Sequence, residues 1–174
     1  SVIDGADALM LSAETSVGLY PIRVVEQMRN IISTIEAQGY RYNRFHLPEA
    51  MSNTFISDSV CYNACVMASQ VGARAIVGIT RSGYTAYKVS SQRPNADILI
   101  FTDIPSMLNV LSLVWGVRVF YYKGSVATDE TILELQHILK EKGFVDPNDI
   151  IVNLASVPLG EQGRTNMIKL GRVK

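Results

Sequence analysis

Short, uninterrupted apolar runs alternate with helical patterns through the middle of the chain, and this alternation constrains the fold more than any other feature. A run such as residues 98–101, Ile-Leu-Ile-Phe, is typical of a strand that helices cover on both faces. The order strand, helix, strand, helix predicts parallel strands joined by right-handed crossovers. The expected elements are strand 75–80, helix 83–91, strand 97–102, helix 105–114, strand 118–122 and helix 128–142.

The end of the chain departs from this order. Residues 149–154 form another apolar run, but the connection 155–165 has no helical period and is too short for a crossover. The last run, 166–173, is therefore expected to return antiparallel at the edge of the sheet. Together these patterns predict the α/β class, with a three-layer α/β/α sandwich around a five-stranded mixed sheet that is mostly parallel and has an antiparallel last strand.

The residues before the alternating region read as a separate piece. Residues 8–11 are expected to form a short buried strand, and no obvious partner strand precedes it. Because Ser1 is not an initiator methionine, we expect the chain to be truncated at this end. Pro21 then occupies the first turn of an amphipathic helix, 21–37, which Gly39 ends.

The domain organisation follows from these patterns. Residues 1–39 form the separate piece, and the irregular residues 40–52 are interpreted as a linker. A helical pattern over 54–70 then opens a domain that we place at residues 53–174.

Composition points to a cytoplasmic protein. Sixteen basic residues balance sixteen acidic ones, so no sequence-wide charge favours nucleic acid or an anionic membrane surface as a partner. No apolar run approaches the roughly 20 residues that span a bilayer, and the N-terminus lacks the pattern of a signal peptide. Cys61 and Cys65 stand four apart in a helical pattern, which predicts buried, reduced thiols rather than a disulfide.

One loop has the residue types of a phosphate site. It runs from a strand into a helix and contains Thr80, Arg81, Ser82, Gly83, Tyr84 and Thr85. Its hydroxyl groups, the amides around the glycine and the positive end of the helix dipole would meet at one point. The alternative is that these residues only cap a helix and relieve a tight turn.

A second loop precedes the final strand and is rich in glycine. Gly160, Gly163 and Arg164 lie in it, and the expected topology would bring it beside the first loop. The alternative is an ordinary hairpin loop. His46 and His137 have no Cys, Asp or His partner at a metal-ligand spacing, so no metal site is predicted.

Several segments in register resemble the pyruvate kinase family. The segment 4–15, followed by Gly18 and Tyr20-Pro21, is similar to the region of that family's last barrel strand. Residues 75–86 and the stretch Gly163-Arg-Thr-Asn166 follow in the family's order. The resemblance covers essentially the whole chain.

The resemblance implies a tetrameric enzyme of glycolysis that transfers phosphate from phosphoenolpyruvate to ADP with magnesium and potassium. The family's catalytic groups and cation ligands lie earlier in its (β/α)8 barrel, so residues 1–39 would be a remnant of that barrel, with its last strand and helix. Residues 53–174 would be the C-terminal regulatory and assembly domain. The chain alone is therefore expected to bind no cofactor, to be inactive, and to form a homo-oligomer, here a dimer.

The same resemblance implies an allosteric phosphate site. Its residues would be those of the first loop, Thr80 to Thr85, together with Gly160, Gly163 and Arg164. Residues 123–143 contain neither the tryptophan nor the arginine that fructose-bisphosphate-responsive members have there, so a monophosphate, a nucleotide or no effector stays open. The alternative function is a free-standing α/β phospholigand-binding module, against which the partnerless strand at 8–11 argues.

Overall fold

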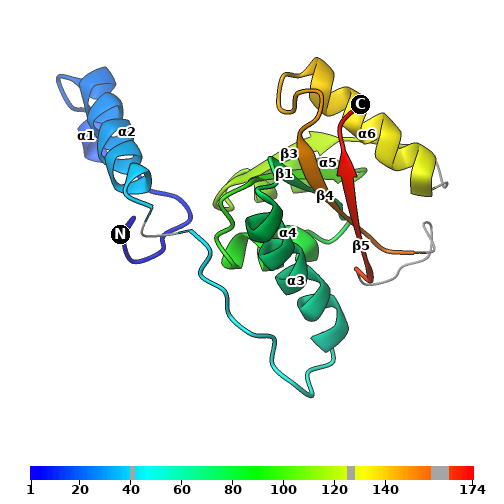
Figure 1. Cartoon of the computed structure of the whole chain (residues 1–174). Helices are drawn as coiled ribbons and strands as arrows, with labels where there is room; N and C mark the ends of the chain where they lie inside the picture. The colour runs from blue at the N-terminus through cyan, green and yellow to red at the C-terminus, as the bar shows by residue number, and fades with distance from the viewer. Residues whose placement is uncertain (40–41, 125–127, 158–164) are drawn as a thin grey trace. The chain divides into compact units, whose positions relative to one another are not determined.

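The computed structural model of the chain describes residues 1–39, 42–124, 128–157 and 165–174 (Figure 1). These residues divide into two compact units, Ser1–Tyr42 and Asn43–Lys174. The division falls within the stretch 40–52, which the sequence led us to interpret as a linker. Among the described residues, no helix is both long enough and apolar enough to cross a membrane.

The first unit consists of a short helix and a long one. Helix α1 spans Ala13–Ser16 and was not predicted, whereas α2 spans Pro21–Ala37 as expected, with the proline in its first turn. The strand expected at residues 8–11 is wrong: these residues are not in a strand. A strand is held by hydrogen bonds to a partner, and none of the described residues pairs with this run.

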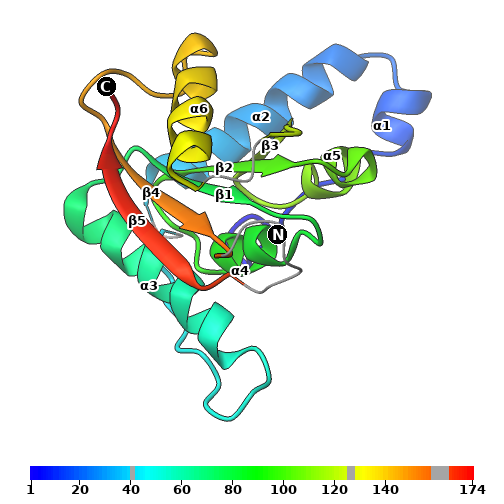
Figure 2. The same cartoon turned by 90° about the vertical axis from the view of Figure 1, so that its right-hand side faces the viewer.

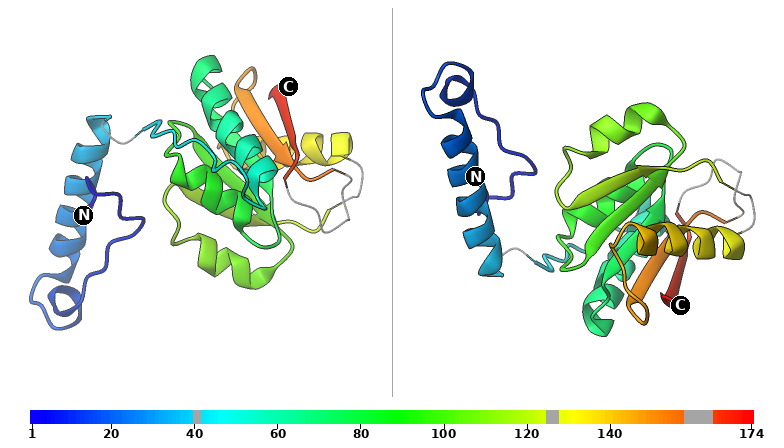
Figure 3. Two further views of the ribbon diagram at one scale, coloured as in Figure 1. Left: turned by 90° about the horizontal axis from the view of Figure 1, so that it is seen from below. Right: turned by 90° about the horizontal axis from the view of Figure 1, so that it is seen from above.

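The second unit contains the alternating strands and helices. Figures 2 and 3 show them as a twisted sheet with helices packed on it. In chain order the elements are α3 (Phe55–Val71), β1 (Ala75–Ile79), α4 (Tyr84–Ser91), β2 (Asp97–Thr102), α5 (Pro105–Leu111), β3 (Val117–Tyr121), α6 (Thr128–Glu141), β4 (Ile150–Ala155) and β5 (Met167–Arg172).

The sheet has five strands in the order β3-β2-β1-β4-β5. The first four strands are parallel, and β5 pairs antiparallel with β4, for example through Val152 and Leu170. The expected mixed sheet with an antiparallel last strand is thus confirmed. Its cause is the one identified in the sequence, since the connection from β4 to β5 is too short for a helical crossover.

Two apolar clusters lie on opposite faces of the sheet and make the sandwich three layers thick. Ile98 and Ile100 of β2 belong to the cluster that includes buried residues of α3, α4 and α5. Leu99 and Phe101 belong to the other cluster, with residues of α6. Figure 2 shows α6 on one side of the sheet and α3 and α4 on the other. The alternation explains why the strand sequences are apolar without interruption.

The two cysteines lie in α3, inside the first cluster. Cys61 and Cys65 are free and buried, which confirms the prediction of reduced core thiols. Burial raises the pKa of each thiol to about 12, so both remain protonated at neutral pH.

Candidate functional site

The candidate site lies at the centre of the sheet, where the chain changes direction. From β1 the chain proceeds outward to β2 and β3, and it then returns to place β4 on the other side of β1. In parallel α/β sheets, ligands bind at the carboxyl ends of the strands at such a switch point. The loops that follow β1 and β4, which are the two loops singled out in the sequence, both begin there.

The first loop is held by its own side chains. Thr80 Oγ1 accepts a hydrogen bond from the Gly83 amide at 3.0 Å, and Ser82 Oγ accepts one from the Tyr84 amide at 3.4 Å. Gly83 has a φ of 81°, in the left-handed region that favours glycine. The structure therefore brings together the residues at 80, 82 and 83 around the beginning of α4, where amides lack helical partners.

The first loop meets the chain at the end of the second loop. Thr85 Oγ1 and Thr165 Oγ1 form a hydrogen bond of 2.7 Å, and both residues are buried. Gly160, Gly163 and Arg164 lie outside the described residues, immediately before Thr165. The expectation that the topology brings the second loop beside the first is therefore borne out at this one described contact.

A pair of opposite charges stands beside the loop. Arg81 forms an ion pair of 3.3 Å with Asp103, the residue that follows β2, and the arginine side chain is 63% exposed. The buried Oδ1 atom of Asp103 has no hydrogen-bond partner among the described residues. The arginine is placed to attract an anion, but the carboxylate beside it lowers the local positive potential.

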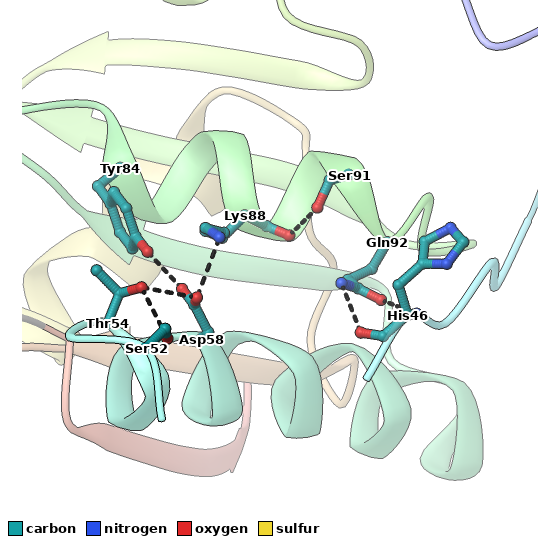
Figure 4. Close-up of polar contacts among 8 residues, drawn as sticks. All are labelled: His46, Ser52, Thr54, Asp58, Tyr84, Lys88, Ser91 and Gln92. Carbon is teal, nitrogen blue, oxygen red and sulfur yellow. Dashed lines mark hydrogen bonds and ion pairs between the residues drawn. The ribbon is translucent and has the colours of Figure 1, made fainter. Parts of the chain in front are cut away.

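Tyr84 does not direct its hydroxyl group toward the other residues of the loop. Its hydroxyl donates a hydrogen bond to Asp58 Oδ1 on α3 (Figure 4). Asp58 Oδ2 accepts two more, from Lys88 Nζ at 3.1 Å and from Thr54 Oγ1 at 3.0 Å. Tyr84 is therefore part of the attachment of α4 to α3.

The pKa of Asp58 reflects opposing effects. Burial alone would raise it, but the hydrogen bonds from Tyr84, Lys88 and Thr54 and the positive charge of Lys88 outweigh burial and lower the pKa. The pKa of Lys88 is raised, chiefly by its hydrogen bond to Asp58. The two groups form an ion pair, with the lysine side chain 39% exposed.

Sequence reasoning missed Asp58 and the contact of Thr165. Acidic residues are common in the first turn of a helix because the helix dipole stabilises them there. Asp58 therefore did not indicate a contact with a distant part of the chain. Thr165 lies in the stretch 163–166 that resembles the family, but its hydrogen-bond partner, Thr85, is 80 positions away.

A second hollow in this unit is too small for a ligand of this kind. A small pocket between β1, β4 and α6, lined in part by Gly78, Thr131 and Asn153, has a volume of about 10 Å³. That volume admits about one water molecule and excludes a phosphate. Within the described ranges, no three or more His, Cys, Asp or Glu side chains gather as a metal site would require.

Comparison with known proteins points to one family. Residues 58–170 match the model of the pyruvate kinase alpha/beta domain. The chain is 35% identical over 172 residues to a pyruvate kinase of Lactobacillus delbrueckii subsp. bulgaricus and 39% identical over 174 residues to one of Staphylococcus haemolyticus. Each match covers 98% of this chain but only 29% of the relative, so the chain spans less than a third of their length.

Solved structures agree in fold. A pyruvate kinase from Cryptosporidium parvum superposes with a TM-score of 0.85 at 25% identity, covering 99% of this chain and 34% of that one. A second crystal structure of pyruvate kinase from the same organism gives a TM-score of 0.80 at 22% identity, with the same coverage.

Proposed function

The chain belongs to the pyruvate kinase family, and from this premise we propose that it is the assembly and effector-binding part of an enzyme that transfers phosphate from phosphoenolpyruvate to ADP. In this proposal residues 1–39 are a remnant of the catalytic barrel, with α2 as its last helix. The second unit is the regulatory domain. Its effector is a phosphorylated small molecule that the loop before α4 binds.

The observation that carries the effector site is the hydrogen bond between Thr85 and Thr165. It joins the chain after β1 to the chain before β5 at the switch point of the sheet. The amides of Gly83 and Tyr84, at the positive end of α4, supply donors for an anion. Arg81, which is mostly exposed, supplies the nearby cation.

Calorimetric titration tests this site. The full chain is titrated with inorganic phosphate, phosphosugars and nucleoside monophosphates, and then Ser82→Asp is titrated with whichever of these binds. The new carboxylate stands where the ligand's charge belongs, so this variant should lose binding. Ser69→Asp is the matched control, because it adds the same charge at an exposed serine of α3 that precedes β1, at the opposite end of the strand. Equal binding by both variants would place the ligand elsewhere.

The proposal assigns no catalysis to this chain alone. Magnesium and potassium are expected for the complete enzyme, and no step through either ion is assigned to the residues described here. An assay that couples pyruvate formation to lactate dehydrogenase, with both cations present, should show no turnover above buffer. Reproducible turnover by the pure chain would contradict this part of the proposal.

Self-association through β5 is the assembly part of the proposal. Among the described residues β5 pairs with β4 alone, so its outer edge is open to a strand from a second copy. We expect a dimer in sedimentation at micromolar concentration. Leu170→Lys, at a 42% exposed position of β5, should weaken it, whereas Leu133→Lys, at a 51% exposed position of α6, should not. A parent chain that stays monomeric would refute the interface.

A further inference from the structure

Helix α4 contacts the first turn of α3 through Tyr84 and Lys88, and at its end it contacts the polypeptide that precedes α3. At its beginning, Tyr84 and Lys88 donate to Asp58, and Asp58 also accepts from Thr54 (Figure 4). Ser52 Oγ lies 3.3 Å from Thr54 Oγ1 and extends this hydrogen-bonded chain. The first half of α4 is thereby connected to residues 52–58.

At the other end of α4, Gln92 holds the backbone of His46. The Gln92 Oε1 atom accepts from the His46 amide at 2.8 Å, and Gln92 Nε2 donates to the His46 carbonyl at 3.3 Å. Figure 4 shows this amide and the Asp58 cluster at opposite ends of one helix. The next residue, Arg93, accepts at its carbonyl from the amide of Asn43 at 2.6 Å.

One polar side chain in each contact is buried, and this makes the loss of its hydrogen bonds costly. Asp58 is 9% exposed and Gln92 is 8% exposed. When a buried carboxylate or amide loses its hydrogen-bond partners, the folded state loses the full free energy of desolvating that group. The contacts at both ends of α4 therefore tend to persist or to break together with the packing around them.

The backbone at the second contact is also held in an uncommon conformation. Asn43 has a φ of 58° and Arg93 a φ of 51°, both in the left-handed region. Residues other than glycine adopt this region at a cost and keep it only where their surroundings fix it. The hydrogen bond between these two residues, and the one from the Asn95 amide to Asn43 Oδ1, supply that fixation.

We propose that α4 couples the loop at residues 80–83 to residues 43–54, with Asp58 and Gln92 as the positioning residues at the two contacts. The helix between them is about 12 Å long at 1.5 Å per residue, and it is stiff on that scale. A change in order at the loop is transmitted to residues 43–54, at the beginning of the second unit, and the reverse holds equally. The coupling would regulate the anion site proposed above. The existence of that anion site rests on the proposed function, whereas the coupling rests on the contacts of α4.

Hydrogen exchange of the full chain, measured by mass spectrometry without ligand, tests the coupling. Tyr84→Phe removes one hydroxyl group, and Gln92→Leu removes both contacts to His46. Each variant should raise exchange roughly three- to tenfold both in residues 80–83 and in residues 43–54, the range expected for the loss of one or two hydrogen bonds. An increase confined to the end of α4 that was altered overturns the coupling.

Three controls separate coupling from other effects. Tyr87→Phe makes the same change at a 43% exposed tyrosine of α4 and should leave both regions unchanged. Exchange in β4, at residues 150–155, reports global unfolding. A parallel rise there would attribute the faster exchange in the two regions to global unfolding and would overturn the coupling. If Gln92→Leu does not fold, Gln92→Glu keeps the acceptor for the His46 amide and removes only the donor.

Hydrogen exchange of the parent chain with added inorganic phosphate tests the proposed function separately from the coupling. In the parent chain the phosphate should slow exchange in residues 80–83 and also in residues 43–54. Protection of the loop alone, without residues 43–54, overturns the coupling while leaving the anion site intact. Protection of neither region contradicts the anion site, and the coupling is then decided by the ligand-free comparison of the variants at Tyr84 and Gln92.

Discussion

Replacing Asp58 with asparagine should destabilise the second unit by roughly 2–3 kcal/mol. The asparagine keeps a carbonyl oxygen for the Tyr84 hydroxyl, but it loses the charge-assisted bond from Lys88 and the bond from Thr54. A charge-assisted bond contributes roughly 1.5–3 kcal/mol and a neutral one roughly 0.5–1.5. Because Lys88 is 39% exposed, solvent screening brings its contribution to the lower end of that range.

The same substitution should remove part of the acid sensitivity of the fold. The pKa of Asp58 in the folded chain lies below its ordinary value of 3.8, so its stabilisation is complete above that pH and is lost as the pH falls through the lowered pKa. The raised pKa of Lys88 keeps the lysine protonated throughout this range, so its titration does not contribute. The stability difference between parent and Asp58→Asn should therefore shrink below about pH 4.

Urea denaturation measures both effects. The chain has one tryptophan, Trp115, which lies in the second unit and stacks against Arg93 at 4.7 Å, so its fluorescence reports on that unit. Urea midpoints are compared for the parent, Asp58→Asn, Lys88→Met and the double variant. This double-mutant cycle isolates the interaction energy between Asp58 and Lys88. Equal stability of parent and Asp58→Asn at neutral pH, or an identical loss in acid, would refute the reasoning.

Three further predictions concern the loop and the core. Gly83→Ala should lower the urea midpoint more than Gly72→Ala. Both glycines have a positive φ, which costs a residue with a Cβ roughly 1–2 kcal/mol. At Gly83 the Cβ would also lie 3.1 Å from two side-chain carbons, whereas at Gly72 it meets nothing within 4 Å. Cys61 and Cys65, whose pKa burial raises to about 12, should react with iodoacetamide only after unfolding, and equal rates in the folded chain would contradict this. Asp103→Asn should raise the affinity for inorganic phosphate by about three- to tenfold at low salt, and an unchanged affinity in calorimetry would exclude Arg81 as the cation.

The fold was predictable because its causes are local in the sequence. Strands such as β2 are apolar without interruption because alternate residues pack on helices at opposite faces of the sheet. An uninterrupted apolar run in the sequence therefore predicts a strand that is covered on both faces. The antiparallel β5 follows from the length of one connection. The error at residues 8–11 has the complementary reason: apolar character indicates burial, but only a partner makes a strand, and none of the described residues provides one.

The contacts around the candidate site were predictable only where they are short-range. Thr80 accepts from an amide three positions away, and such a capping contact can be inferred from residue types. Thr85 meets a partner 80 positions away, and Tyr84 meets Asp58 across 26 positions. Gln92 holds the backbone rather than the side chain of His46, so the residue type at position 46 carries no trace of the contact.

The internal contacts of the loop limit which ligands it can bind. Thr80 and Ser82 already accept from the amides of Gly83 and Tyr84, and Asp103 already pairs with Arg81. A ligand must exchange these bonds for its own, and it gains only if its bonds are stronger. Charge-assisted bonds are roughly twice as strong as neutral ones, and a phosphate has three acceptor oxygens and nearly two charges with which to form them. A singly charged carboxylate offers two oxygens and half that charge, so the exchange favours phosphorylated ligands over carboxylates at this loop.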